Sequence, residues 1–281
     1  MPRNPTGHAV EREFLTLPVW DQLNASSCEQ VAGAVERCLP EPWAFKQLAW
    51  HELGGQKRHV AVFDWNRSEF SLIPGARTVL GYDRKQPHTP TPEQLESWEH
   101  SREGYGHPTL KKYLAASCTK LRTVTVEPLL VETMPAEGFG SEDDHEERAA
   151  FLGTQFRLPT EDEWEYVCGA GSRTLWRWGD ACPLDGYPYD YRRKRRFDLH
   201  RAPNAFGLTF PHDEYQAEGV QGRKKGTIVP RSGSGGVMTC GGAGTLIAWL
   251  TLATSFDPTK YGGDYFDCIR RVYPLPTVMF G

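Results

Sequence analysis

The sequence predicts an α+β fold that is rich in loops, and three observations support this expectation. Glycine and proline are both frequent, with 28 and 21 residues in a chain of 281, and both favour turns over long regular elements. Segments of alternating apolar and polar side chains predict strands, while segments that begin with a capping residue predict short helices. The nine tryptophans indicate a core built largely from aromatic side chains.

Composition and charge are those of an ordinary globular protein. The net charge of −4 gives no global field that would favour nucleic acid or an anionic membrane. No apolar run approaches the roughly 18 residues of a membrane span, and the first residues lack the apolar segment of a signal peptide. Seven cysteines at scattered spacings are typical of reduced thiols. We therefore expect a cytoplasmic protein without a membrane segment.

Residues 1–59 are expected to form an N-terminal helical extension that packs on the core. Its clearest helix can be capped by Ser26 or Ser27 and ends at Pro40, because proline cannot continue a helix. Residues 60–281 are assigned to one domain.

Two stretches of this domain, residues 60–75 and 122–131, alternate apolar and polar side chains as half-buried strands do. Pro128 lies in the second stretch and has no N–H to donate, which indicates an edge position. Residues 83–108, between these two stretches, are expected to form an insertion, and residues 181–203 are expected to form a long loop. We infer no role for either segment from the sequence.

Several helix starts are marked by capping residues. Thr91 can cap a helix in which Pro92 takes the first position and Gln94 completes a capping box. A second short helix is expected at residues 110–118. Ser141 is expected to cap a further helix with an acidic first turn.

The most informative stretch runs from residue 156 to residue 168. Thr160 can cap a helix whose third residue, Glu163, reaches back to the backbone of Thr160 and completes a capping box. Trp164, Val167 and Cys168 then lie at helical spacing and form one apolar face. The stretch therefore predicts an amphipathic helix.

This stretch, Arg157-Leu-Pro-Thr-Glu-Asp-Glu-Trp-Glu165, resembles the signature of the formylglycine-generating enzyme (sulfatase-modifying factor) family. Pro203-Asn-Ala-Phe-Gly-Leu208 resembles the family's Asn-x-Phe-Gly-Leu turn, and Ser255-Phe-Asp-Pro258 resembles the ergothioneine- and ovothiol-synthase-like members. The motifs follow the family order over most of residues 60–276. The resemblance implies a formylglycine-generating-enzyme-like domain with a variant C-type lectin-like fold, with small twisted antiparallel sheets and a few helices.

The resemblance implies less about catalysis. Formylglycine-generating enzymes carry two cysteines close together in the strand after Gly-Gly-Ser, and two thiolates suit Cu(I). Residues 241–249 contain no cysteine, so copper is not expected and the chain is a divergent member. Cys240 alone is near, as a weak catalytic candidate or as a small buried hydrophobe. The histidine pattern of the ergothioneine-synthase-like iron site is also absent.

Three carboxylates after Leu208 are candidate calcium ligands, because calcium prefers hard oxygen donors: Asp213, Glu214 and Glu218. The alternative is an exposed acidic turn. A basic run at residues 191–196 is typical of a solvated loop. Since no interleaved stacking aromatics accompany it, nucleic acid is not an expected partner.

Five residues are candidates for a ligand pocket. Aromatic rings offer flat apolar faces, and arginine offers a bidentate grip on a carboxylate or phosphate. The candidates are Trp176, Trp178, Cys240, Trp249 and Arg270. The alternative for the tryptophans is that they belong to the core.

Two classes of function remain open. The first is a non-catalytic or repurposed recognition protein that binds a small molecule or a peptide, or acts within a larger protein assembly. The second is an oxygen-dependent oxidoreductase with a non-standard metal site. The missing cysteine pair and the missing histidine pattern favour the first class.

Overall fold

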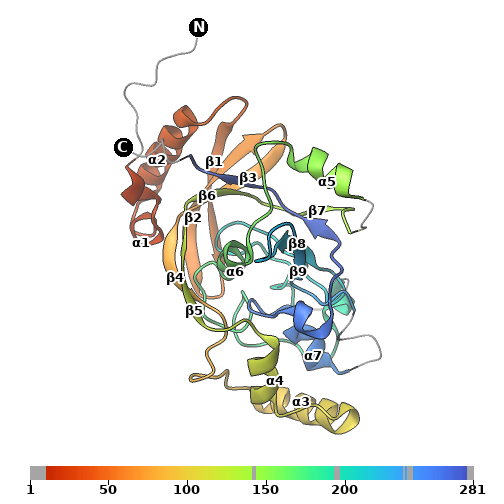
Figure 1. Cartoon of the computed structure of the whole chain (residues 1–281). Helices are drawn as coiled ribbons and strands as arrows, with labels where there is room; N and C mark the ends of the chain where they lie inside the picture. Colours follow the sequence, from red (N-terminus) through yellow and green to blue (C-terminus); the bar gives the residue numbers. More distant parts are fainter. Residues whose placement is uncertain (1–10, 141–143, 193–196, 237, 239–242, 277–281) are drawn as a thin grey trace.

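The structure is a computed structural model that describes residues 11–140, 144–192, 197–236, 238 and 243–276 (Figure 1). Groups of helices and groups of strands follow one another along the chain. The α-helices are α1 (Leu17–Trp20), α2 (Ala25–Cys38), α3 (Pro92–Tyr105), α4 (Leu110–Ser117), α5 (His145–Leu152), α6 (Glu161–Gly169) and α7 (Thr245–Leu250). The 3-10 helices are η1 (Arg12–Leu15), η3 (Pro188–Arg192) and η4 (Pro258–Tyr261).

The strands of the described residues form small sheets in which most neighbours are antiparallel. They are β1 (Ala44–Leu53), β2 (Gln56–Trp65), β3 (Ser68–Ile73), β4 (Ala76–Leu80), β5 (Arg122–Val126), β6 (Leu129–Glu132), β7 (Ala136–Glu137), β8 (Glu218–Gln221), β9 (Ile228–Arg231), β10 (Cys268–Ile269) and β11 (Val272–Pro274). The sheet orders are β1-β2-β3-β6-β11, β7-β10-β8-β9 and β4-β5. Strands β8 and β10 are parallel. This confirms the predicted α+β class.

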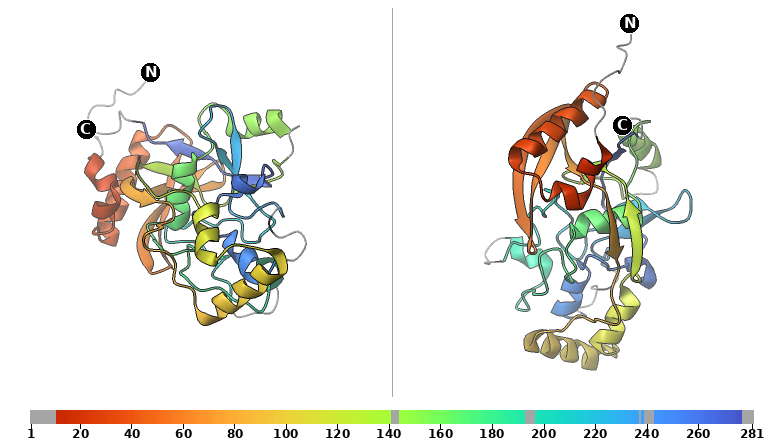
Figure 2. Two further views of the ribbon diagram at one scale, coloured as in Figure 1. Left: turned by 60° about the horizontal axis from the view of Figure 1, so that its bottom comes forward. Right: turned by 90° about the vertical axis from the view of Figure 1, so that its left-hand side faces the viewer.

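The N-terminal segment is helical only in part. Strand β1 pairs with β2 along its whole length, with Ala49 opposite Val60 and Trp50 opposite His59. The expected boundary between residues 59 and 60 therefore falls inside β2, within the largest sheet. Helix α2 packs along one face of β1 and β2 (Figure 2), where it joins a buried apolar cluster of that sheet.

The cap of α2 differs from the predicted one. The Asn24 Oδ1 accepts the Ser27 N–H at 2.9 Å, so Asn24 rather than Ser26 or Ser27 caps the helix. Asparagine is as good a capping residue as serine, and the sequence alone did not separate these neighbours.

The two predicted strand stretches are each divided. Residues 60–75 contain the end of β2 and all of β3, joined at Asn66 and Arg67, which both have positive φ. Residues 122–131 contain β5 and part of β6, which lie in different sheets. Pro128 lies between β5 and β6. A residue that cannot donate to a ladder therefore marks the point where the chain leaves one sheet for another.

Helix α3 begins as predicted. The Thr91 Oγ1 accepts the Gln94 N–H at 3.2 Å, and the Gln94 Oε1 accepts the Thr91 N–H at 3.0 Å. Helices α3 and α4 lie together at one end of the molecule (Figure 1). Asp144 is the N-cap residue of α5, and the predicted cap Ser141 lies outside the described residues.

Helix α6 lies at the centre of the molecule (Figure 1) and confirms the predicted capping box of Thr160 and Glu163. Its face with Trp164, Val167 and Cys168 is buried. The Asn204 side chain fastens the end of this helix by donating to the carbonyl oxygens of Val167 at 2.6 Å and Cys168 at 3.0 Å. The turn at residues 203–208 thus contacts the C-terminal end of α6.

None of the helices in the described part of the chain combines the length and the apolar character that crossing a membrane requires.

Candidate functional site

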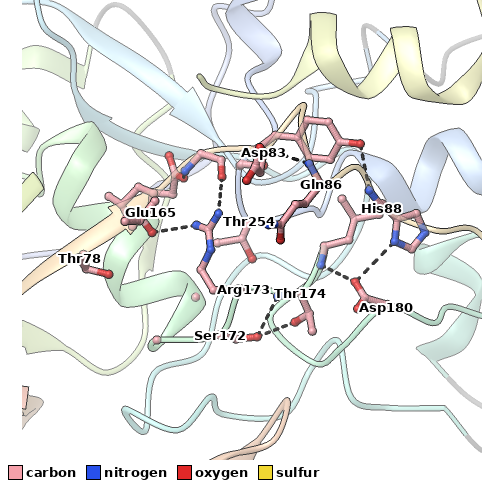
Figure 3. A pocket seen from close by; sticks show the side chains of 18 of the residues that line it. Thr78, Asp83, Gln86, His88, Glu165, Ser172, Arg173, Thr174, Asp180 and Thr254 are labelled. Atoms are coloured by element: carbon pink, nitrogen blue, oxygen red, sulfur yellow. Dashed lines mark hydrogen bonds and ion pairs between the residues drawn. The ribbon is translucent and has the colours of Figure 1, made fainter. Parts of the chain in front are cut away.

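A polar cavity lies beside α6, at a place that the sequence did not indicate. Its volume is about 320 Å³, at the lower end of the range of small-molecule pockets. Its wall combines the end of β4 and the segment after it, part of α6, the loop after α6, and residues after α7 (Figure 3). Its acidic and basic lining residues are Asp83, His88, Glu165, Arg173 and Asp180.

Glu165 of α6 forms one side of the wall and is already paired. Its buried carboxylate accepts hydrogen bonds from the Thr119 hydroxyl and the Arg122 Nη2, each at 2.9 Å, and from the Gly81 N–H. A Cβ at Gly81 would lie 2.2 Å from the Lys120 carbonyl oxygen, and the φ of Gly81 is +87°, so this approach requires glycine. Glu165 therefore fastens β4 to α6.

Arg173, in the loop after α6, supplies hydrogen-bond donors to the cavity. Its Nη1 donates to the Val79 carbonyl oxygen at 2.8 Å, and its Nη2 donates to the Gly81 carbonyl oxygen at 3.1 Å. These bonds fix the guanidinium at the rim (Figure 3). A guanidinium has further N–H groups, and within the described residues they have no partner.

His88 is held between α3 and the loop after α6. Its Nε2 lies 3.1 Å from the Gln94 Oε1, and its Nδ1 lies 3.6 Å from the Asp180 Oδ1. Since an amide oxygen only accepts hydrogen bonds, Nε2 is the donor to Gln94. The Gln94 Nε2 in turn donates to the Asp180 carbonyl oxygen at 3.0 Å. Gln94, the third residue of α3, thereby connects this helix to the cavity wall.

Two aspartates present carboxylate oxygens to the cavity. The Asp180 Oδ1 accepts the Leu175 N–H at 2.7 Å, and the side chain is 54% exposed. The Asp83 Oδ1 accepts the N–H groups of Lys85 at 2.8 Å and Gln86 at 3.4 Å. The Oδ2 atom of each aspartate has no hydrogen-bond partner in the described part of the protein, so each is available to a donor on a ligand.

Two cavity residues lie next to motifs that the sequence analysis identified, but those motifs did not predict the cavity. Asp180 ends the aromatic stretch that begins at Trp176, and His88 precedes the helix start at Thr91. Neither local pattern indicates that His88 and Asp180 are neighbours, because only the tertiary structure brings them together.

The three candidate tryptophans come together, but in the core. Trp176 and Trp178 stack with ring centroids 5.8 Å apart, and Trp249 meets Trp178 edge-on at 6.1 Å. None is more than 7% exposed. Each indole N–H donates to a backbone carbonyl oxygen, those of Trp249, Ala181 and Gly186 respectively. The core alternative therefore describes these residues, and they offer no open face to a ligand.

Arg270 is also buried, and protein groups occupy its guanidinium. Its Nε and Nη2 donate to the two carboxylate oxygens of Glu218, at 2.5 and 2.8 Å. Further bonds reach the carbonyl oxygens of Glu132 at 3.0 Å and Thr209 at 2.7 Å. Arg270 does not line the cavity, and both carboxylate oxygens of Glu218 accept hydrogen bonds from it.

The side chains of the other two calcium candidates also accept hydrogen bonds from backbone N–H groups. The Asp213 Oδ1 accepts the N–H groups of Tyr215 and Gln216, each at 3.0 Å. Glu214 is fully buried, and its Oε2 accepts the Tyr189 N–H at 3.1 Å. Across the described residues, no group of three or more His, Cys, Asp or Glu side chains could hold a metal ion. Asp213, Glu214 and Glu218 therefore form no such group in this part of the chain.

Six of the seven cysteines lie in the described part of the chain. Cys240, the catalytic candidate, lies outside the described residues. Burial raises the pKa of Cys28 and Cys118 to about 11 and that of Cys168 and Cys182 to about 12. These four thiols are therefore protonated at neutral pH, whereas the nucleophile and the metal ligand is the thiolate.

No protein-family model and no curated protein sequence matches this chain.

Proposed function

We propose that this chain is a recognition domain that binds a small polar molecule in the cavity lined by Asp83, His88, Arg173 and Asp180. The observation that carries the proposal is the cavity of about 320 Å³, whose wall combines free carboxylate oxygens with free guanidinium N–H groups. We further propose a divergent formylglycine-generating-enzyme-like domain with a C-type lectin-like fold, on the basis of the motifs at residues 157–165 and 203–208.

The fixed positions of the wall residues support recognition. Arg173 is held by two backbone carbonyl oxygens, and Asp180 by the Leu175 N–H and the contact with His88. Groups that are already held in place lose little conformational freedom when a ligand binds, which favours affinity. A site of this size suits a small molecule better than an extended peptide.

The alternative is an oxygen-dependent oxidoreductase, and its sequence support rests on Cys240. The raised pKa values of the four described thiols named above weigh against a thiolate nucleophile among them. Recognition is therefore the better-supported proposal. Oxygen consumption with a thiol-containing peptide, measured with an oxygen electrode, would favour the oxidoreductase instead.

The test is a thermal-shift screen of small polar metabolites on the wild type and two variants. Thr78 of β4 lines the cavity, so Thr78→Trp should fill it. Thr125 of the paired strand β5 is exposed and does not line the cavity, which makes Thr125→Trp the matched control. We expect compounds that stabilise the wild type and Thr125→Trp and do not stabilise Thr78→Trp. The proposal is wrong if no compound stabilises the wild type, or if all hits stabilise Thr78→Trp equally.

A further inference from the structure

We infer that the ligand of this cavity is a small zwitterion, a molecule that carries an ammonium group and a carboxylate. The inference rests on the proposed recognition function and adds the chemical class of the ligand. It follows from the opposite charges on one wall, where Asp83 and Asp180 lie with Arg173 around the same cavity (Figure 3).

The acidic part of the wall fits an ammonium group. In both Asp180 and Asp83, Oδ1 accepts hydrogen bonds from backbone N–H groups, and Oδ2 has no partner within the described structure. An ammonium group has several N–H donors and no acceptor, so it can donate to either of these oxygens. Hydrogen bonds between charged partners are stronger than those between neutral ones.

The basic part of the wall fits a carboxylate. The Nη1 and Nη2 atoms of Arg173 each donate to a backbone carbonyl oxygen, which fixes the plane of the guanidinium. The remaining N–H groups can donate to a carboxylate, the acceptor that matches guanidinium geometry best.

The other charged groups of the wall do not change this charge pattern. Glu165 is buried and paired with Arg122 at 2.9 Å, so it does not attract a second cation. His88 contacts Gln94 and Asp180 through its two ring nitrogens. A ligand with a single charge would form charge-assisted hydrogen bonds with either the aspartates or Arg173 but not with both. A zwitterion satisfies both.

The experiment compares ligands that differ only in charge. Isothermal titration calorimetry measures the binding of the twenty free L-amino acids, their amides as cations, their N-acetyl forms as anions, and glycerol and neutral monosaccharides. We expect at least one free amino acid to bind about tenfold or more tightly than its own amide and N-acetyl form, since a hydrogen bond to a charged group contributes about that factor.

Variants assign each charge to its residue. Asp180→Asn should reduce the preference for the free amino acid over its N-acetyl form, because only Asp83 would remain to accept from the ammonium group. Arg173→Gln should abolish the preference over the amide. Matched controls are Asp264→Asn and Arg102→Gln, at exposed positions outside the cavity, and these should leave both preferences unchanged. Circular dichroism checks that each variant is folded.

The outcomes separate this inference from the proposed function. If neutral compounds bind in the cavity and the amino acids do not, or if the amides bind as well as the free amino acids, the zwitterion inference is overturned and recognition stands. If no small polar compound binds to the wild type, both are overturned.

Discussion

Arg270 and Glu218 form an ion pair in which both side chains are fully buried, with 2.5 Å between the Arg270 Nε and the Glu218 Oε1. The Arg270 guanidinium also lies over the Phe210 ring, 4.4 Å from its centroid. The sequence had assigned these two residues to different sites, Arg270 to a ligand and Glu218 to calcium. Each instead supplies the charge that makes burial of the other tolerable.

Replacing Glu218 with Gln should cost about 3–5 kcal/mol of unfolding free energy, because Arg270 would remain buried without a counter-charge. Urea unfolding measures the loss. The matched control is Glu99→Gln, which breaks the exposed pair of Glu99 and Arg102 and should cost about 0–1 kcal/mol. Equal stability of the two variants would contradict the structural role of the buried pair. If Glu218→Gln does not fold, the double change of Glu218 and Arg270 to Met should restore folding.

Replacing Trp164 with Ala should destabilise the protein by about 3–5 kcal/mol, the usual cost of deleting a large core side chain. Trp164 is 1% exposed and meets Phe210 edge-on, with ring centroids 5.7 Å apart. Among the described residues its indole N–H has no hydrogen-bond partner, so Trp164→Phe should lose much less stability. An unchanged melting temperature in Trp164→Ala would contradict the burial of Trp164 in the core.

Glu214 should make stability depend on pH. Burial raises the pKa of Glu214 from 4.5 to about 7, so between these pH values the folded state holds a proton that the unfolded state has released. Stability should therefore fall as pH rises from about 4.5 to 7. Glu214→Gln resembles the protonated side chain and should remove this fall. The check is the urea midpoint of both proteins between pH 4.5 and 8, with Glu99→Gln as control. Parallel curves for the wild type and Glu214→Gln would refute the prediction.

The helix starts at Thr91 and Thr160 could be predicted from the sequence because a capping box uses neighbours in the chain. Each needs a hydroxyl and a side chain three residues later, and both form as expected. The cap of α2 shows the limit of such reasoning. Asn24, Ser26 and Ser27 can all cap a helix, and the backbone geometry selects Asn24.

The candidate site could be predicted far less well. The sequence placed Trp176, Trp178 and Trp249 near one pocket, and in the structure their rings contact one another. The sequence did not determine whether these tryptophans line a solvent-facing cavity or lie in the core. The cavity itself combines residues from Thr78 to Ser255, and no local pattern links such distant positions.

The sequence by itself determined the α+β class, the start of α6 and the aromatic character of the core, because these depend on side-chain type and on spacing within a few residues. Only the tertiary structure decided which charged side chains are paired with other protein groups and which keep donors or acceptors for a ligand. Arg270 is occupied by Glu218, 52 residues away, whereas Arg173 keeps donors for the cavity. Burial and charge pairing depend on which distant segments the fold brings together, and spacing along the chain does not contain that information.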